Sequence, residues 1–396
     1  MRKLPWAAAG VAAWITLDLY FGKKHHRSKA GLYEPPAITT GDASLFIHGE
    51  TFFEHLLKQI RASESTIYMH FYIFRNDSIG GEILKALQRK AKEGVKVKLL
   101  VDWVGARLSP KIRRRLKKSG VKLHYAQKPR LPFLFYSLNE RNHRKVTVID
   151  GEHAYVGGFN VGDEYTGGDP KIGMWRDYHL YVQGVAVASL GKQFARDWFA
   201  ASGEKLRITR PKKRPEKEIP IQLLSTDGAH VTDHFKELFS RAKKSVFIGT
   251  PYYIPGHEMH TEVLKLAERG VKVQLLIPKN PDHPLVRDGA FNYIRELLDA
   301  GVGVRQFSEG FYHAKLMLID NKILDISTSN FDMRSFYINH EINCTIEDKA
   351  WVKNVQNIIQ RDFFTYGEEI TYEMLDSRNF WDHTREKSAK LISPWM

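Results

Sequence analysis

Two stretches of the sequence carry the same polar residues at the same spacing. Each holds a histidine, a lysine two residues later and an aspartate five residues after that: His143, Lys145 and Asp150 in RNHRKVTVIDG, then His313, Lys315 and Asp320 in FYHAKLMLIDN. An imidazole can act as nucleophile, general base or general acid, and an ammonium stabilises a developing oxyanion. One such match arises readily by chance. Two at equivalent positions of one chain indicate a reaction that needs both.

Further polar residues follow each stretch. A turn of small residues ends in Asn160 after the first stretch and in Asn330 after the second, at the same distance from each histidine. A later acid completes each set, Asp177 in WRDYHL and Glu341 in NHEINC. We expect the amides to donate to an oxyanion, and each acid to accept a hydrogen bond from a histidine ring, which fixes its tautomer.

The elements that position these residues are expected to be strands. HRKVTVID and HAKLMLID are rich in β-branched and aliphatic residues. Side chains two residues apart on a strand point the same way. His143 and Lys145 are therefore predicted to share a face, and so are His313 and Lys315.

The repeat extends beyond these strands and predicts a duplicated domain. EGVKVKLLVD (93–102) recurs as RGVKVQLLIP (269–278), and STIYMHFYIF (65–74) corresponds to SVFIGTPYYI (245–254). In each half, apolar runs follow stretches with helical periodicity that end in Gly. This alternation predicts an α/β sandwich with a largely parallel core.

A charged, proline-punctuated segment, GEKLRITRPKKRPEKEIP, separates the halves and is typical of a linker. The predicted organisation is a transmembrane anchor at 4–22, a first domain at 40–202, a linker at 203–219, a second domain at 220–365 and a C-terminal tail at 366–396.

Composition narrows the class of partner. The 396 residues carry a formal charge of +15, which favours nucleic acid, a membrane surface or a phosphate-bearing substrate. Cys344 is the one cysteine, so an intramolecular disulfide and a thiol metal site are excluded. The sequence has no carboxylate cluster with metal-ligand spacing, and we expect neither a metal nor a cofactor.

The N-terminus contains LPWAAAGVAAWITLDLYFG, in which Asp18 is the one charged side chain. A spanning helix needs roughly 20 mainly apolar residues, so this segment is just long enough. A cleaved signal peptide and a buried soluble helix are the alternatives, but no small-residue cleavage site follows. More Lys and Arg residues follow the segment than precede it, which predicts a single-pass cell-membrane protein with its body on the cytoplasmic face.

At this point the chain resembles the phospholipase D superfamily, and within it the bacterial cardiolipin synthases. The resemblance runs from about residue 40 to the end. It is carried by HFYIFRND, RNHRKVTVIDG, GGFNVGDEY, WRDYHL, TPYYIP, DHPLVR, GFYHAKLMLID and SNFDMRSF. Two features depart from the family. Many relatives have two N-terminal membrane helices instead of one, and the second turn begins with Ser327 where Gly is usual.

The resemblance implies two tandem phospholipase D-like α/β/α sandwich domains with pseudo-twofold symmetry, plus one N-terminal transmembrane helix. One histidine attacks phosphorus and forms phosphohistidine, and the other protonates the leaving alkoxide. The family favours His143 as the nucleophile. Asp150 and Asp320 are assigned to the catalytic set as members of the repeated motif, and are interpreted as bracing loops instead of touching substrate. One phosphatidylglycerol would release glycerol, and a second would attack to give cardiolipin.

Three alternatives stay open at this level. A membrane-bound phospholipase D hydrolase would use the same residues with water as acceptor, and a nucleic-acid phosphodiesterase would suit the basic charge. A lipid-binding module without activity would need a broken motif, and both motifs are intact. The stretch PRLPFLFY (129–136) is interpreted either as buried core or as a contact with the membrane interface. Together with the predicted anchor, it favours a lipid substrate over nucleic acid. We therefore expect phosphatidylglycerol and an anionic membrane surface as partners, and no nucleic acid. The oligomeric state stays open.

Overall fold

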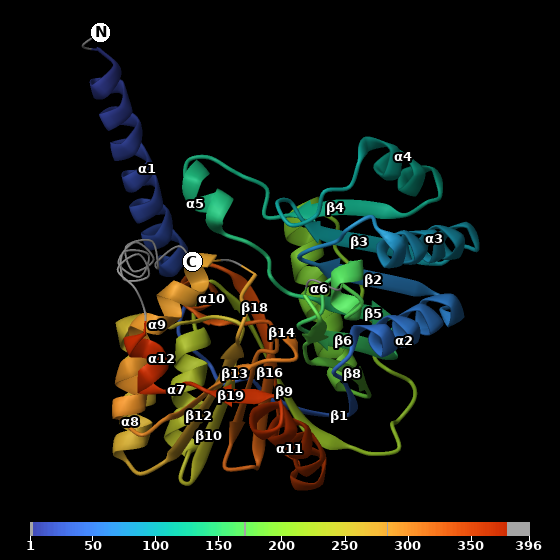
Figure 1. Ribbon diagram of the computed structural model, residues 1–396. Coiled ribbons are helices and arrows are strands. Elements are labelled where there is room, and N and C mark those ends of the chain that lie inside the picture. Colours follow the sequence, from blue (N-terminus) through green and yellow to red (C-terminus); the bar gives the residue numbers. More distant parts are fainter. Residues whose placement is uncertain (1–2, 170–171, 283, 378–396) are drawn as a thin grey trace.

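A single mixed β-sheet of fifteen strands runs through the whole molecule (Figure 1). The computed structural model describes residues 3–169, 172–282 and 284–377. The end of the predicted tail, 378–396, lies outside the described residues.

The first half contributes seven strands, in the spatial order β1, β8, β6, β5, β2, β3, β4. They are β1 (Ile38–Phe46), β2 (Thr66–Phe71), β3 (Lys96–Asp102), β4 (Lys122–Ala126), β5 (Val146–Ile149), β6 (His153–Gly157) and β8 (His179–Gln183). Its helices are α2 (Gly49–Ala62), α3 (Ser78–Lys92), α4 (Pro110–Lys118), α5 (Leu134–Asn139) and α6 (Ala186–Ser202), with a 3₁₀ turn at Asp163–Thr166.

The second half repeats this order from the centre outwards: β9, β18, β16, β15, β10, β12, β13, with β19 added at the edge. These strands are β9 (Ile219–Asp227), β10 (Ser245–Gly249), β12 (Lys272–Pro278), β13 (Gly303–Phe307), β15 (Leu316–Ile319), β16 (Ile323–Ser327), β18 (His340–Ile346) and β19 (Gly367–Glu369). Its helices are α7 (Val231–Arg241), α8 (Gly256–Glu268), α9 (Pro284–Asp299), α10 (Met333–Tyr337), α11 (Lys349–Phe364) and α12 (Tyr372–Asp376). A separate small ladder pairs β11 (Tyr253–Ile254) with β17 (Phe331–Asp332).

The two halves meet at an antiparallel seam between β1 and β9. Ile38 lies opposite Gln222, and Gly41 lies opposite Ile219. Because the strand order reads outwards in the same way from this seam, the halves are related by a pseudo-twofold axis. The seam pairs two strands that would otherwise be exposed edges.

The expectation of a largely parallel core is wrong. Parallel pairing in the large sheet is confined to β2–β3–β4 and β10–β12–β13, and its other described neighbours are antiparallel. The strands after the two histidines cause this difference, because each turns back at once as a hairpin. The turns use positive φ at Asp150 (55°) and Gly151 (71°), and at Asp320 (52°) and Asn321 (54°). A short turn of this kind can join only antiparallel neighbours.

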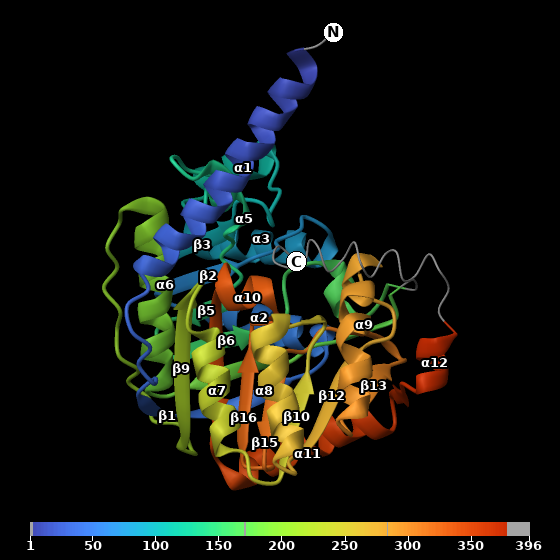
Figure 2. The same ribbon diagram turned by 90° about the vertical axis from the view of Figure 1, so that its left-hand side faces the viewer.

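Helices cover both faces of each half. Figure 2 shows α7, α8 and α9 side by side over one face of the second-half strands. Helices α2 and α3 form a core with the corresponding face of the first half. A third core contains side chains of α6 and α11 together with strands of both halves. The apolar packing is therefore continuous across the seam.

Helix α1 (Lys3–Ser28) projects from the body, and its second half packs on α5 (Figure 1). The rings of Trp14 and Phe135 lie 4.9 Å apart, and the Tyr136 backbone N–H donates to Asp18 Oδ1 at 2.8 Å. Gly22 allows close approach, since a Cβ there would lie 2.4 Å from the Cβ of Tyr136. Across the described stretches of chain, no helix combines the length and apolar character that a membrane crossing requires.

Candidate functional site

The two histidine–lysine pairs lie at matching places in the two halves. His143 and Lys145 immediately precede β5, and His313 and Lys315 immediately precede β15. All four side chains are buried, with at most 8% of their surface exposed. The hydrophobic strands that follow fix the position of these residues. The polar side chains are therefore buried beside the ends of β5 and β15.

Two short backbone crossings bring the halves together here. In one, β7 (Met174–Arg176) pairs in parallel with β14 (Gly310–Tyr312), and the His313 N–H donates to the Arg176 carbonyl at 2.7 Å. In the other, Asn142 bridges His340, and the His143 N–H donates to the His340 carbonyl at 2.9 Å. The segment entering each histidine is thus paired with the segment entering the acid of the opposite half.

The acids are consequently exchanged between the halves. His143 Nδ1 donates to Glu341, at 3.0 and 3.1 Å from its two oxygens, and His313 Nδ1 donates to Asp177 at 2.5 Å. The sequence pattern grouped each acid with the motif of its own half, and that grouping is wrong. The strand crossings explain why, because they place each acid beside the histidine that lies far away in the sequence.

The two lysines are held in a dry environment. Lys145 Nζ donates to the His143 carbonyl at 2.8 Å, and burial together with the Lys315 ammonium lowers the pKa of Lys145 to about 7. Lys315 Nζ donates to the His313 carbonyl and lies 3.8 Å from Asp177. Burial lowers the pKa of Lys315 to about 8. Burial makes the charged form of each lysine unfavourable. An anion bound beside the two lysines would raise their pKa values and favour the charged form.

Burial and the neighbouring charges also shift the pKa values of the histidines and the acids. Burial lowers the pKa of His143, and burial with the Lys315 ammonium lowers the pKa of His313 to about 4. Burial alone would raise the pKa of Asp177 and Glu341, but the neighbouring lysines and histidines hold both pKa values below the ordinary range. The site therefore offers two imidazoles with Nδ1 committed to carboxylates, which leaves Nε2 of each ring for chemistry.

Asn160 and Asn330 follow β6 and β16, and both are buried. Asn160 Oδ1 accepts from the Ile73 N–H at 3.0 Å, which fixes the orientation of its amide. The Asn330 backbone N–H donates to Ser335 Oγ at 3.1 Å. Both residues belong to the turns that also support the acids.

The two turns support their acids differently. A Cβ at Gly158 would lie 1.8 Å from Asp177 Oδ1, so only glycine leaves room for that carboxylate. At the matching position, Thr328 Oγ1 donates to Glu341 at 2.5 Å. Ser327, the departure noted in the sequence, accepts from the Ser329 N–H at 3.2 Å within the turn. The replacement of glycine is therefore accommodated by hydrogen bonds inside the second turn.

Asp150 and Asp320 do not join this site. They follow β5 and β15, at the opposite ends of these strands from the histidines. Asp150 accepts from backbone N–H groups of residues 64–66, and Asp320 does the same for residues 243–245. The bracing interpretation agrees with these contacts, whereas membership of the catalytic set does not.

Two aromatic residues beside the histidines carry no assignment from the sequence. The Tyr72 ring lies 5.0 Å from the His143 ring, and the Trp175 ring lies 5.0 Å from the His313 ring. Tyr72 occupies the repeat position of Tyr252, and Trp175 stands two residues before Asp177. The sequence features that could have indicated these residues are the repeated tyrosine and the position of Trp175 close to Asp177. Their rings exclude water from one side of each imidazole.

Comparison with known proteins gives a consistent result. The family described as "Cardiolipin synthase, PLD-like domain" matches residues 56–198 and 235–363. Minor cardiolipin synthase ClsB of Bacillus subtilis (strain 168) is 37% identical over 383 residues, covering 96% of each chain. A cardiolipin synthase of Halalkalibacterium halodurans is 36% identical and covers 91% of this chain and 73% of its own length.

Among solved structures, phosphatidylserine synthase of Haemophilus influenzae Rd KW20 superposes with a TM-score of 0.69 at 16% identity. The match covers 95% of this chain and all of the other. At this identity the likeness concerns the fold, and it extends over both halves.

Proposed function

The chain belongs to the cardiolipin synthase family of phospholipase D-like proteins, and we propose that it converts two phosphatidylglycerol molecules into cardiolipin and glycerol. The observation that carries this proposal is the exchange of acids between the halves. Each histidine is completed by a carboxylate of the opposite half, so both motifs serve one reaction centre.

In the first step, His143 Nε2 attacks phosphorus and the bond from phosphorus to the glycerol oxygen breaks. His313 gives its proton to that oxygen, and glycerol leaves. A phosphatidyl group remains covalently bound to His143. The anionic phosphodiester beside His313 would raise the pKa of this imidazole, since an opposite charge favours the protonated form.

In the second step, His313 accepts the proton from a free hydroxyl of another phosphatidylglycerol. The alkoxide oxygen attacks phosphorus, the bond to His143 breaks, and cardiolipin forms. Lys145 and Lys315 stabilise the charge on the phosphoryl oxygens, with Asn160 and Asn330 as neutral donors. Asp177 and Glu341 are positioning residues, because they act through the histidines. These groups fill the roles of nucleophile, acid and charge stabiliser without a metal or cofactor.

A membrane location forms part of the proposal, with residues 4–22 as a single span and the body on the cytoplasmic face. It is supported by large apolar side chains that are exposed along α1, namely Val11, Trp14, Leu17, Tyr20 and Phe21. Leu131, in the loop before α5, is a further large apolar side chain that is 76% exposed. An anionic membrane surface suits the charge of +15, and nucleic acid is not expected as a substrate.

The division at 40–202, 203–219 and 220–365 likewise remains our proposal for the domains.

The direct test is to supply purified full-length protein with headgroup-labelled phosphatidylglycerol in detergent. We expect labelled glycerol and labelled cardiolipin in equal amounts. A His143→Ala variant is the control for contaminating lipases. Release of glycerol with phosphatidic acid as the lipid product would contradict the proposal and identify a hydrolase.

A further inference from the structure

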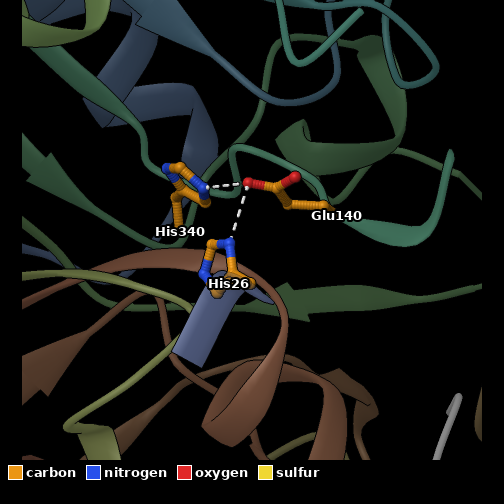
Figure 3. A group of neighbouring side chains, drawn as sticks. All are labelled: His26, Glu140 and His340. Carbon is orange, nitrogen blue, oxygen red and sulfur yellow. Dashed lines mark hydrogen bonds and ion pairs between the residues drawn. The ribbon is translucent and has the colours of Figure 1, made fainter. Parts of the chain in front are cut away.

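A second cluster of ionisable side chains lies where α1 meets both halves of the body (Figure 3). His26 comes from the last turn of α1, Glu140 follows α5, and His340 begins β18. One ligand atom from each lies within 4.8 Å of the others. His340 Nε2 is 2.8 Å from Glu140 Oε1, and His26 Nδ1 is 3.5 Å from the same oxygen. Three potential metal ligands therefore converge on one point.

The outer nitrogens of the two rings share a partner, Asp227. His340 Nδ1 is 3.0 Å from Asp227 Oδ1, and His26 Nε2 contacts the Asp227 carbonyl oxygen. Metal-binding histidines almost always donate their other ring N–H to a carboxylate or a backbone carbonyl, which directs the ligating nitrogen towards the ion. Both rings have this arrangement, and in both the inner nitrogen faces Glu140.

The repeat does not explain the cluster. In the other half, the positions that match Glu140 and His340 are occupied by Gly310 and Arg176. The repeated catalytic motifs therefore do not require a glutamate or a histidine at these two positions. The cluster exists on one side of the pseudo-twofold axis, where α1 supplies the third member.

We propose that His26, Glu140 and His340 bind a divalent transition-metal ion, with Zn²⁺ as the best fit. Two imidazole nitrogens and one carboxylate oxygen suit zinc, whereas Ca²⁺ and Mg²⁺ prefer oxygen ligands throughout. Glu140 and Asp227 place negative charge beside the ion, and each carboxylate also pairs with an arginine, Arg130 and Arg144 respectively. A water molecule completes a tetrahedral set.

Two other contacts must be compatible with the ion. Arg130 donates to Glu140 Oε2 at 2.6 Å, and this bond leaves Oε1 for the metal. The Gln127 amide nitrogen lies 2.7 Å from His340 Nε2 and 3.3 Å from Glu140 Oε1. Its side chain is half-buried, and binding of the ion would require it to turn away or to present its amide oxygen.

The ion has a route to the site. A cavity of about 730 Å³ is lined by all three ligands and reaches the exposed side chains of Lys29 and Lys192. Solvent therefore extends to the cluster, which a binding site for a free ion requires.

Binding at this place would fasten three parts of the molecule together. The ligands come from α1, the first half and the second half, and the His340 carbonyl accepts from the His143 N–H. The ion would stabilise the junction without touching the reacting groups. The inference therefore does not depend on the proposed reaction.

The test uses full-length protein in detergent after removal of metals with a chelator. Zn²⁺ is titrated by calorimetry, Tm is measured with and without Zn²⁺, and Co²⁺ is added as a spectroscopic probe. We expect one Zn²⁺ per chain above any weak background, a higher Tm and the intense visible bands of tetrahedral Co²⁺. His26→Asn and Glu140→Gln should each abolish these three signals. His25→Asn, at the exposed neighbouring position on α1, should preserve them.

Equal binding by His26→Asn and His25→Asn would overturn the proposal, since the ion would then be held by other histidines. Absence of binding in the unmodified protein would also overturn it, with the cluster held by protons and hydrogen bonds alone. His26 and Glu140 provide two independent variants, and circular dichroism of each establishes that it is folded.

Discussion

At the scale of single residues, the two histidines have equivalent contacts but are expected to differ in role. Each donates Nδ1 to a buried carboxylate, and each lies beside a lysine. We expect His143→Ala and His313→Ala both to lower cardiolipin synthesis by at least about 10³-fold.

An activated phosphodiester, whose leaving group needs no proton, separates the two roles. His313→Ala should still release a burst of leaving group and retain a phosphatidyl adduct on His143, which peptide mass spectrometry detects. His143→Ala should show neither. The reverse pattern would exchange the roles, and an adduct on both variants would refute a shared site.

Gly158 provides a second prediction, because its missing side chain makes room for Asp177. Gly158→Ala should displace the carboxylate and misorient His313, and a displacement of about 1 Å can cost 10²-fold in kcat. The matched control is Gly81→Ala on α3, where a Cβ meets no atom within 4 Å. A kcat for Gly158→Ala equal to that of Gly81→Ala would contradict the close fit.

The buried lysines predict how anion binding depends on pH. An amine carries its charge below its pKa, so Lys145 and Lys315 lose charge as the pH rises through about 7 and about 8. The Kd of tungstate, whose charge is constant over this range, should therefore increase between about pH 6 and pH 9, by roughly tenfold for each pH unit above the pKa of a lysine that must be charged. Lys145→Met should bind more weakly at pH 6 and lack the lower step. A Kd independent of pH would show that the lysines do not contact the anion.

At the scale of elements, the β1–β9 seam and the crossings before each histidine hold the site together. The linker between α6 and β9 contributes no residue to the site, so the seam should keep the halves associated after the chain is cut. We expect a protein cleaved within residues 210–217 to retain activity within about tenfold of the intact protein, since the halves remain paired along β1–β9 and share one apolar core.

Each half produced alone should be inactive, because it lacks the acid for its own histidine. Activity should return on mixing. Synthesis by either half alone would contradict the exchanged pairing, and analytical ultracentrifugation of the cut protein provides the control for association.

The sequence was sufficient to predict the repeat and the strands that carry the histidines and lysines, because periodicity and motif spacing are local properties. It did not indicate that Asp150 and Asp320 lie away from the histidines or that Tyr72 and Trp175 lie beside them. It could not specify which acid meets which histidine. That choice depends on backbone crossings between residues 198 and 136 positions apart. The hairpins were also missed, since a short buried strand looks the same whether its neighbour is parallel or antiparallel. The cluster of His26, Glu140 and His340 could not be predicted either, because contacts between distant parts of the chain bring these residues together.

At the scale of the whole molecule, α1 is the element that we propose holds the protein at the membrane. A Met396 reporter fusion that is active only in the cytoplasm, together with resistance of the protein to alkaline extraction from membranes, is the expected outcome for a span at residues 4–22. Deleting residues 2–22 should release the protein from membranes but leave it folded, because none of the side chains described in this segment, 10–22, belongs to the sheet cores. Activity of the reporter outside the cytoplasm would reverse the orientation.

The exchanged pairing also has a consequence for a chain that is still being made. His143 leaves the ribosome long before Glu341 exists, and His313 appears after Asp177 but before the strand that completes the second half. Contacts this far apart in sequence form late, after both halves have folded and docked. With the anchor and the nucleophile that we propose, a growing chain would carry no completed nucleophile until synthesis is almost finished. Under the same proposal, the topology itself would protect nearby lipid from premature attack.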